Sequence, residues 1–284
     1  MRIGLSTPMV MQLPGVSSAW ETTAGVDDLA RIARTADELG FDHLTCAEHV
    51  AVPVGDGAQR GVTYWDPLST FGFLAAHTTR ISLTTSVVVL GYHHPLDIAK
   101  RFGTLDRLSG GRLVLGVGVG SLKEEFDLLG ATFDGRGEQA DDAIRALRAS
   151  LSTTRPSYRG SHYDFDGFAV EPCAVQERVP ILVGGRSLRS LRRAVRLADG
   201  WIPFGLSPTE INAMLAKEDV PAGFEVILST GRAVDPIADA DRTAKRLKAL
   251  RDVGATAITC SVSADSPEHY CDQLAALRDL ADEL

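Results

Sequence analysis

The stretch that decides the fold runs from Arg80 to Gly120 and reads RISLTTSVVVLGYHHPLDIAKRFGTLDRLSGGRLVLGVGVG. It opens with an apolar, β-branched run, Ile81 to Leu90, and closes with a second apolar run, Leu113 to Val119. A strand that is apolar on both faces belongs in a buried parallel sheet. Between the two runs, Pro95 begins a segment of helical periodicity. The stretch therefore predicts a strand, a helix and a second strand parallel to the first.

The same alternation continues along the rest of the chain. Short apolar runs predict further strands, and each is followed by a segment of helical spacing. The predicted strands are 3–6, 43–46, 81–90, 113–119, 180–183, 201–204, 224–229 and 257–262. Eight such units predict one closed (β/α)8 barrel over 1–284, with an insertion at about 121–179 after the fourth strand. An open doubly wound sheet is the competing fold, but no G-x-G-x-x-G fingerprint opens the chain.

Composition narrows the class of protein. The chain has 284 residues, of which 44% are hydrophobic and 23% are charged, as in soluble globular proteins. Its net charge of −8 argues against nucleic acid or an anionic membrane as a partner. We find neither a run of about 20 apolar residues nor a signal-peptide pattern, and so expect a cytoplasmic protein. The four cysteines lack metal-ligand spacing, so we expect reduced thiols and no metal site.

Polar and small residues follow the predicted strands, where a barrel of this kind places its chemistry. They are Ser6, Thr7, Glu48, His49, Ser86, Ser121, Gly184 to Ser187, Gly205, Thr230, Arg232 and Ser263. The set lacks the carboxylate pair of a glycosidase, the clustered ligands of a metal centre and the lysine of a Schiff base. It suits a bound cofactor that supplies its own reactivity.

Several segments carry a resemblance to a known family. They read LTTSVVVLGYHHPLDIAKRFGTLDRLSGGRLVLGVGVGSLKEEF, FDGRGEQADDAIRALR, VPILVGGRSLRSLRRAVRLADGWIPFG and ELGFDHLTCAEHV. Together they resemble the luciferase-like monooxygenase and reductase superfamily, and within it the oxidoreductases that depend on the deazaflavin coenzyme F420. The resemblance implies a (β/α)8 barrel, a homodimer, and hydride transfer between a small organic substrate and a deazaflavin held in the barrel mouth.

The resemblance also implies a cofactor-binding set. It places a non-prolyl cis peptide between Ser86 and Val87, under the cofactor ring. Gly184-Gly185-Arg186-Ser187 opens a helix directly after a strand, so its free N–H groups offer a phosphate site. Thr7, at the end of the first strand, completes the predicted set. Arg232 is a second candidate for an anionic tail.

His49 and Glu48 are the predicted catalytic residues, because the resemblance places an acid–histidine pair after the second strand. Imidazole exchanges protons near neutral pH, and Glu48 would orient it or contact the cofactor. Ser121 stands where the sugar-phosphate dehydrogenases of the family carry a glutamate, which argues against that substrate. A monooxygenase that uses flavin mononucleotide (FMN) and a cofactor-binding protein without turnover stay open as alternatives. A metal-dependent hydrolase is a more distant one.

Overall fold

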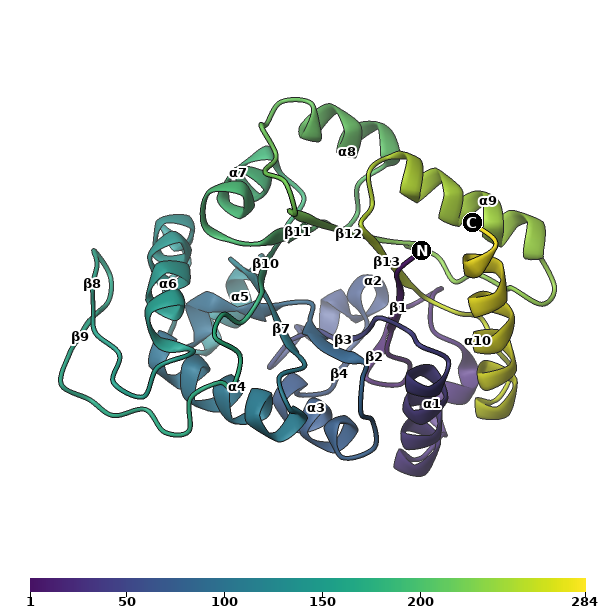
Figure 1. The fold of residues 1–284 in the computed structure, drawn as a ribbon, viewed down its shortest axis with the longest axis horizontal. Helices are drawn as coiled ribbons and strands as arrows, with labels where there is room; N and C mark the ends of the chain where they lie inside the picture. The colour runs from purple at the N-terminus through teal and green to yellow at the C-terminus, as the bar shows by residue number, and fades with distance from the viewer.

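The computed structural model describes residues 1–284 as a ring of parallel strands inside a ring of helices (Figure 1). The strands of the inner ring are β1 (Ile3–Ser6), β3 (His43–Cys46), β5 (Ser82–Thr85), β7 (Leu113–Gly118), β10 (Ile181–Gly184), β11 (Gly200–Ile202), β12 (Glu225–Ser229) and β13 (Ala257–Cys260). Each pairs in parallel with the next, and β13 pairs with β1, so the sheet closes on itself. The predicted (β/α)8 barrel is confirmed.

The helices begin and end where local sequence signals place them. The longer ones are α1 (Val26–Glu38), α3 (Pro67–Ala75), α4 (Pro95–Ser109), α6 (Arg136–Ser150), α7 (Leu188–Leu197), α8 (Pro208–Leu215), α9 (Ala240–Asp252) and α10 (Pro267–Asp282). Ser266 caps α10 by accepting a hydrogen bond from the backbone N–H of His269, and Gly110 ends α4 with a φ of 71°. No helix is both long and apolar enough to cross a membrane.

The strand predicted over 81–90 is divided, which corrects the sequence prediction. β5 ends at Thr85, β6 (Val88–Val89) pairs with β7, and η3 (Leu90–Tyr92) follows. The peptide bond between Ser86 and Val87 is cis, as the family resemblance implied. The Val87 side chain occupies space that Gly118 leaves open, where a Cβ would lie 2.6 Å from Val87 Cγ2. The break therefore depends on a neighbouring strand, and a uniformly apolar run gives no local sign of it.

Between β7 and β10 the chain adds more than one helix. α5 (Lys123–Leu128) precedes α6, and a small antiparallel hairpin of β8 (Tyr158–Arg159) and β9 (Asp164–Phe165) follows it. The hairpin projects outward beside α6 (Figure 1). Buried Asp142 on α6 anchors it, because its carboxylate accepts hydrogen bonds from Tyr158 Oη at 2.6 Å and from the backbone N–H of His162 at 2.7 Å.

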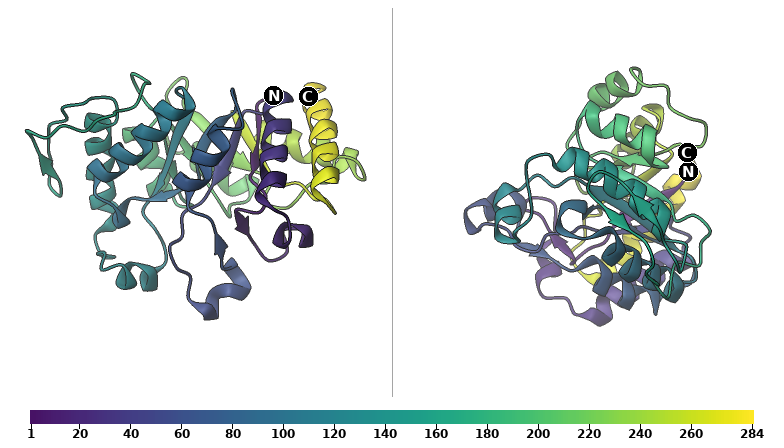
Figure 2. Two further views of the ribbon diagram at one scale, coloured as in Figure 1. Left: turned by 90° about the horizontal axis from the view of Figure 1, so that it is seen from below. Right: turned by 90° about the vertical axis from the view of Figure 1, so that its left-hand side faces the viewer.

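The two ends of the barrel differ. Figure 2 shows the segment with η2 (Val54–Asp56) and α2 (Gly57–Arg60) projecting from the end opposite the two chain termini. A further pair of short strands, β2 (Met11–Gln12) and β4 (Thr63–Tyr64), joins this segment to the loop that contains η1 (Ala19–Thr22). These segments follow β1 and β3, so they cover the carboxyl ends of the strands.

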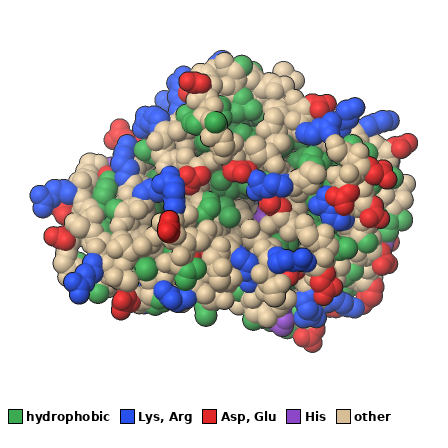
Figure 3. All heavy atoms as spheres, in the orientation of Figure 1, with side chains coloured by type: hydrophobic (Ala, Val, Ile, Leu, Met, Phe, Trp, Pro, Cys, Tyr) green, Lys and Arg blue, Asp and Glu red, His purple; other side chains and the backbone are tan.

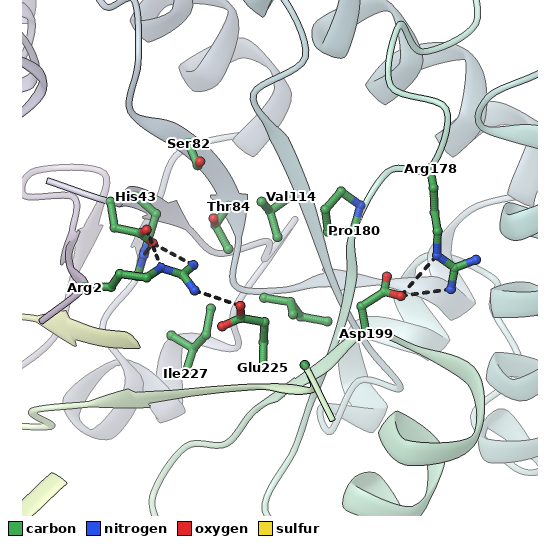
Figure 4. A pocket seen from close by; sticks show the side chains of 13 residues that line it. Arg2, His43, Ser82, Thr84, Val114, Arg178, Pro180, Asp199, Glu225 and Ile227 are labelled. Atoms are coloured by element: carbon green, nitrogen blue, oxygen red, sulfur yellow. Dashed lines mark hydrogen bonds and ion pairs between the residues drawn. The ribbon is translucent and has the colours of Figure 1, made fainter. Parts of the chain in front are cut away.

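The amino ends of the strands surround a cavity of about 270 Å³ whose charges are already paired (Figure 4). Arg2 donates to Asp42 Oδ1 from Nε and to Glu225 Oε1 from Nη1, both at 2.7 Å. On the other side of the cavity, Arg178 donates to Asp199 Oδ1 at 2.9 Å. Acidic and basic side chains also alternate over this face of the molecule (Figure 3). This end of the barrel therefore serves stability, as is usual for the fold.

His43 fills the barrel interior near this cavity. A Cβ on Gly4 would lie 2.4 Å from the imidazole ring, so the ring needs a glycine beside it. Its Nδ1 lies 2.8 Å from Asp42 Oδ2 and its Nε2 lies 2.8 Å from Thr259 Oγ1. His43 thus links β3 to β13 across β1, the strand at which the ring closes.

Asp42→Asn should lower the free energy of unfolding by about 1 kcal/mol, because Arg2 is half exposed and its ion pair is partly screened. Burial alone would raise the pKa of the Asp42 carboxyl. Hydrogen bonds from His43 and Arg2 outweigh burial and hold this pKa well below its ordinary value. The ionised Asp42 carboxylate should therefore stabilise the folded protein above about pH 4, and this contribution should be lost as the pH falls. Thermal unfolding of both proteins across this range measures the effect.

Asp164→Asn is the matched control, because Asp164 and its partner Arg159 are both well exposed. The control should unfold at nearly the wild-type temperature. Equal melting temperatures for Asp42→Asn and the wild type at neutral pH would contradict a stabilising role for this ion pair.

Candidate functional site

The candidate site lies where segments following β3, β6 and β7 meet at the carboxyl ends of the strands. The segment after β3 contributes Glu48 and His49, η3 and the residue after it contribute Tyr92 and His93, and the first turn of α5 contributes Glu125. Two histidine–carboxylate pairs form between these segments. The neighbours Glu48 and His49 belong to different pairs, because each takes its partner from another part of the chain.

His49 pairs with Glu125, not with Glu48 as the sequence suggested. His49 Nδ1 lies 2.8 Å from Glu125 Oε2, and the His49 side chain is 21% exposed. The Tyr64 ring packs edge-on against the imidazole, with ring centroids 4.6 Å apart. The imidazole is therefore held at one nitrogen and along one face, while Nε2 makes no hydrogen bond within the chain.

Glu125 is a fully buried carboxylate that accepts four hydrogen bonds. Oε1 accepts from the backbone N–H groups of Val50 at 2.5 Å and Ala51 at 3.0 Å. Oε2 accepts from Tyr92 Oη at 2.9 Å and lies opposite His49 Nδ1. Burial alone would raise the pKa of Glu125, but these hydrogen bonds outweigh it and hold the pKa below its ordinary value. An ionised carboxylate can only accept hydrogen bonds, so Glu125 Oε2 presents an acceptor to His49 Nδ1.

Glu48 pairs with His93, which corrects the expectation that it orients His49. Glu48 Oε1 lies 2.8 Å from His93 Nε2, and Oε2 accepts from the backbone N–H of Val89 at 2.7 Å. Because Glu48 contacts His93 and His49 contacts Glu125, the two neighbouring side chains point to different parts of the chain. Glu48 therefore fixes the β6 segment next to the cis peptide.

Of the predicted cofactor-binding residues, Thr7 is the one whose surroundings indicate a missing partner. It lies at the carboxyl end of β1, it is 3% exposed, and its Oγ1 has no hydrogen-bond partner in the chain. Most buried polar side-chain atoms are hydrogen-bonded, so an orphaned hydroxyl at this end of the barrel fits a ligand that would supply the bond.

The structure brings Val87 and Gly184 together, because a Cβ on Gly184 would lie 2.7 Å from Val87 Cγ1. Gly184 thus makes room for the chain's own side chain, a role that the sequence pattern does not show. Gly185 has a φ of 139°, a conformation that favours glycine.

The two polar residues before α7, Arg186 and Ser187, differ in whether their side chains are already bonded within the chain. Ser187 caps α7, since its Oγ accepts from the backbone N–H of Ser190 at 3.3 Å. Arg186 is exposed beside it. The Ser187 hydroxyl is therefore already engaged, and the N–H groups of the first turn and Arg186 are the candidate phosphate ligands.

Sequence reasoning missed Glu125 and Tyr92. Glu125 lies within LKEEF, the end of the longest family-like segment, but nothing local separates it from its neighbour Glu124. Tyr92 stands directly before His93 and His94, in a stretch where Pro95 predicts the start of a helix and nothing marks the tyrosine. No group of three or more His, Cys, Asp or Glu side chains is placed to hold a metal ion.

The sequence of this chain is similar to those of a known protein family. A family model described as luciferase-like monooxygenase matches residues 1–222. An uncharacterized protein of Mycobacterium tuberculosis is 31% identical over 198 residues, which are 66% of this chain and 68% of that protein. An F420-dependent glucose-6-phosphate dehydrogenase of Nakamurella multipartita is 30% identical over 221 residues. The aligned part is 75% of this chain and 61% of that enzyme.

A solved structure extends the likeness to the whole chain. The monooxygenase RslO1 from Streptomyces bottropensis superposes with a TM-score of 0.77 at 21% sequence identity. The match covers 100% of this chain and 99% of that one. At this identity the likeness concerns the fold alone.

Gly118→Ala should destabilise the protein by about 1–3 kcal/mol, because the added Cβ would push Val87 out of its place. Gly72→Ala in α3 is the control: nothing lies within 4 Å of its added Cβ, and alanine favours a helix by about 1 kcal/mol. Urea unfolding measures both. If the two variants had the same stability, the packing of Val87 against β7 would not constrain this segment.

Proposed function

Because this chain belongs to the luciferase-like monooxygenase family, we propose that it is an oxidoreductase that transfers a hydride between coenzyme F420 and a small organic substrate. The F420-dependent dehydrogenase among its relatives supports the choice of cofactor. The observation that carries the proposal is the pairing of His49 with buried Glu125 at the carboxyl ends of the strands. In this pair the His49 imidazole is held in position and can exchange a proton with a substrate.

The residues present fit a deazaflavin. The unpartnered Thr7 hydroxyl would hydrogen-bond a polar atom of the ring, and the backbone at Ser86 would lie under the ring. Gly185, Arg186 and the first turn of α7 would hold the phosphate. When bound, the deazaflavin supplies a carbon centre that gives or accepts a hydride, a two-electron reaction.

His49 is the residue of the chain that accepts and returns the proton. His49 Nε2 is free of hydrogen bonds within the chain, so in neutral imidazole it can accept a proton from a hydroxyl group as hydride leaves the adjacent carbon. In the reverse direction the imidazolium returns that proton to a carbonyl oxygen. Glu125 stays ionised through both steps, because its four hydrogen bonds favour the charged form.

A monooxygenase that uses FMN is the second candidate, because the family model that matches this chain is described as luciferase-like monooxygenase. Titrating the apoprotein with F420 and with FMN separates the two. The proposal predicts tighter binding of F420, whereas a preference for FMN of tenfold or more, about 1.4 kcal/mol, would contradict it. Oxygen consumption during turnover would point the same way. A cofactor that binds without any turnover would indicate a binding protein.

His49→Ala should lower turnover by about 10²–10⁴-fold and leave F420 binding nearly unchanged, because it removes a proton-transfer group and no cofactor contact. The assay follows the absorbance of F420 with a panel of alcohols and carbonyl compounds. His162→Ala is the control, since His162 is exposed in the β8–β9 hairpin. A loss of less than a few-fold in His49→Ala would make His49 a structural residue.

A further inference from the structure

The two oxygens of the Glu125 carboxylate have different tasks. Oε1 is fixed by the backbone N–H groups of Val50 and Ala51, which can only donate. Oε2 faces two side chains, His49 and Tyr92. Val50 and Ala51 directly follow His49 in the chain. The carboxylate is therefore hydrogen-bonded to the same loop that carries the imidazole. The orientation of Glu125 relative to His49 is therefore set at both oxygens.

We propose that Glu125 is the positioning residue of this site: it holds His49 in the tautomer with the proton on Nδ1 and so leaves Nε2 free to take a proton from the substrate. The proposal rests on the proposed function for its catalytic meaning. Its structural content, the tautomer of His49, stands or falls independently of any reaction.

Alternative roles for Glu125 do not account for its partners. A helix-capping carboxylate would accept from the backbone of its own first turn, but the Oε1 and Oε2 donors of Glu125 lie 33 to 76 positions away in sequence. A surface ion pair would be exposed, whereas this side chain is 0% exposed. Burying a carboxylate is costly unless it is fully hydrogen-bonded, and four donors meet that need.

Glu125→Gln tests the proposal, because the amide cannot bind the same four donors. The backbone N–H groups of Val50 and Ala51 require the amide oxygen at the Oε1 position. The NH₂ group must then face His49 Nδ1, which becomes an acceptor. The proton of neutral His49 consequently moves to Nε2, and the nitrogen that would take a proton from the substrate is blocked.

The tautomer is read directly from the ¹⁵N chemical shifts of His49 in protein labelled with ¹⁵N-histidine, assigned with His49→Ala. The wild type is expected to show a protonated Nδ1 and an unprotonated Nε2 at a pH at which the ring is neutral. Glu125→Gln is expected to show the reverse. Turnover of Glu125→Gln should fall by roughly 10²–10⁴-fold with little change in KM, as when a catalytic histidine is held in the wrong tautomer.

Two variants serve as controls. Tyr92→Phe removes one hydrogen bond to Oε2 but keeps the negative charge, so His49 should keep its wild-type tautomer. Glu124→Gln changes an exposed neighbour of Glu125 and should also leave the tautomer unchanged.

The proposal is overturned if wild-type His49 carries its proton on Nε2, a result that does not depend on any variant folding. It is also overturned if folded Glu125→Gln keeps the wild-type tautomer. A reversed tautomer in Glu125→Gln supports it. A reversed tautomer together with full turnover would keep Glu125 as the group that orients His49 and would refute the proton-transfer role given to His49 under the proposed function.

Discussion

Closure of the sheet is the constraint on which the rest of this structure depends. β1 pairs with β13 and β7 pairs with β10, so every strand of the ring has two neighbours. Because all the strands are parallel, their carboxyl ends share one end of the barrel and their amino ends share the other. Thr7, His49 and Glu125 therefore come to one end from distant parts of the chain. The paired charges around Arg2 gather at the opposite end.

Much of this ring could be predicted from the sequence, because short apolar runs and helical spacing are local signals. β1 and β3 have the predicted bounds, and α4 begins at Pro95 as expected. The divided strand over 81–90 could not be predicted from its residues alone. Its composition continues without interruption, and the room for Val87 comes from glycines on β7 and β10. A resemblance to relatives, not a propensity, pointed to the cis peptide.

The partners of the site residues were harder to predict than the strands. Glu48 and His49 are adjacent in sequence and the family resemblance suggested that they act as a pair, but their side chains point to different parts of the chain. Each then finds its partner on another segment, His93 for Glu48 and Glu125 for His49. Such long-range pairs follow from the closed topology together with the exact direction of each side chain. Spacing in the sequence predicts neither the two pairs nor the direction of these side chains.

The pairing of β1 with β13 also bears on the order in which the barrel is made. Ile3 pairs with Ile258, 255 positions later in the chain (258 − 3 = 255). Joining segments so far apart costs loop-closure entropy before any hydrogen bond forms, which favours slow and late closure. During synthesis β1 emerges early but can pair only with β3 until β13 exists. A chain halted before residue 257 would hold a curved, open sheet with unpaired backbone along β1 and β12, an edge on which strands of other molecules can add.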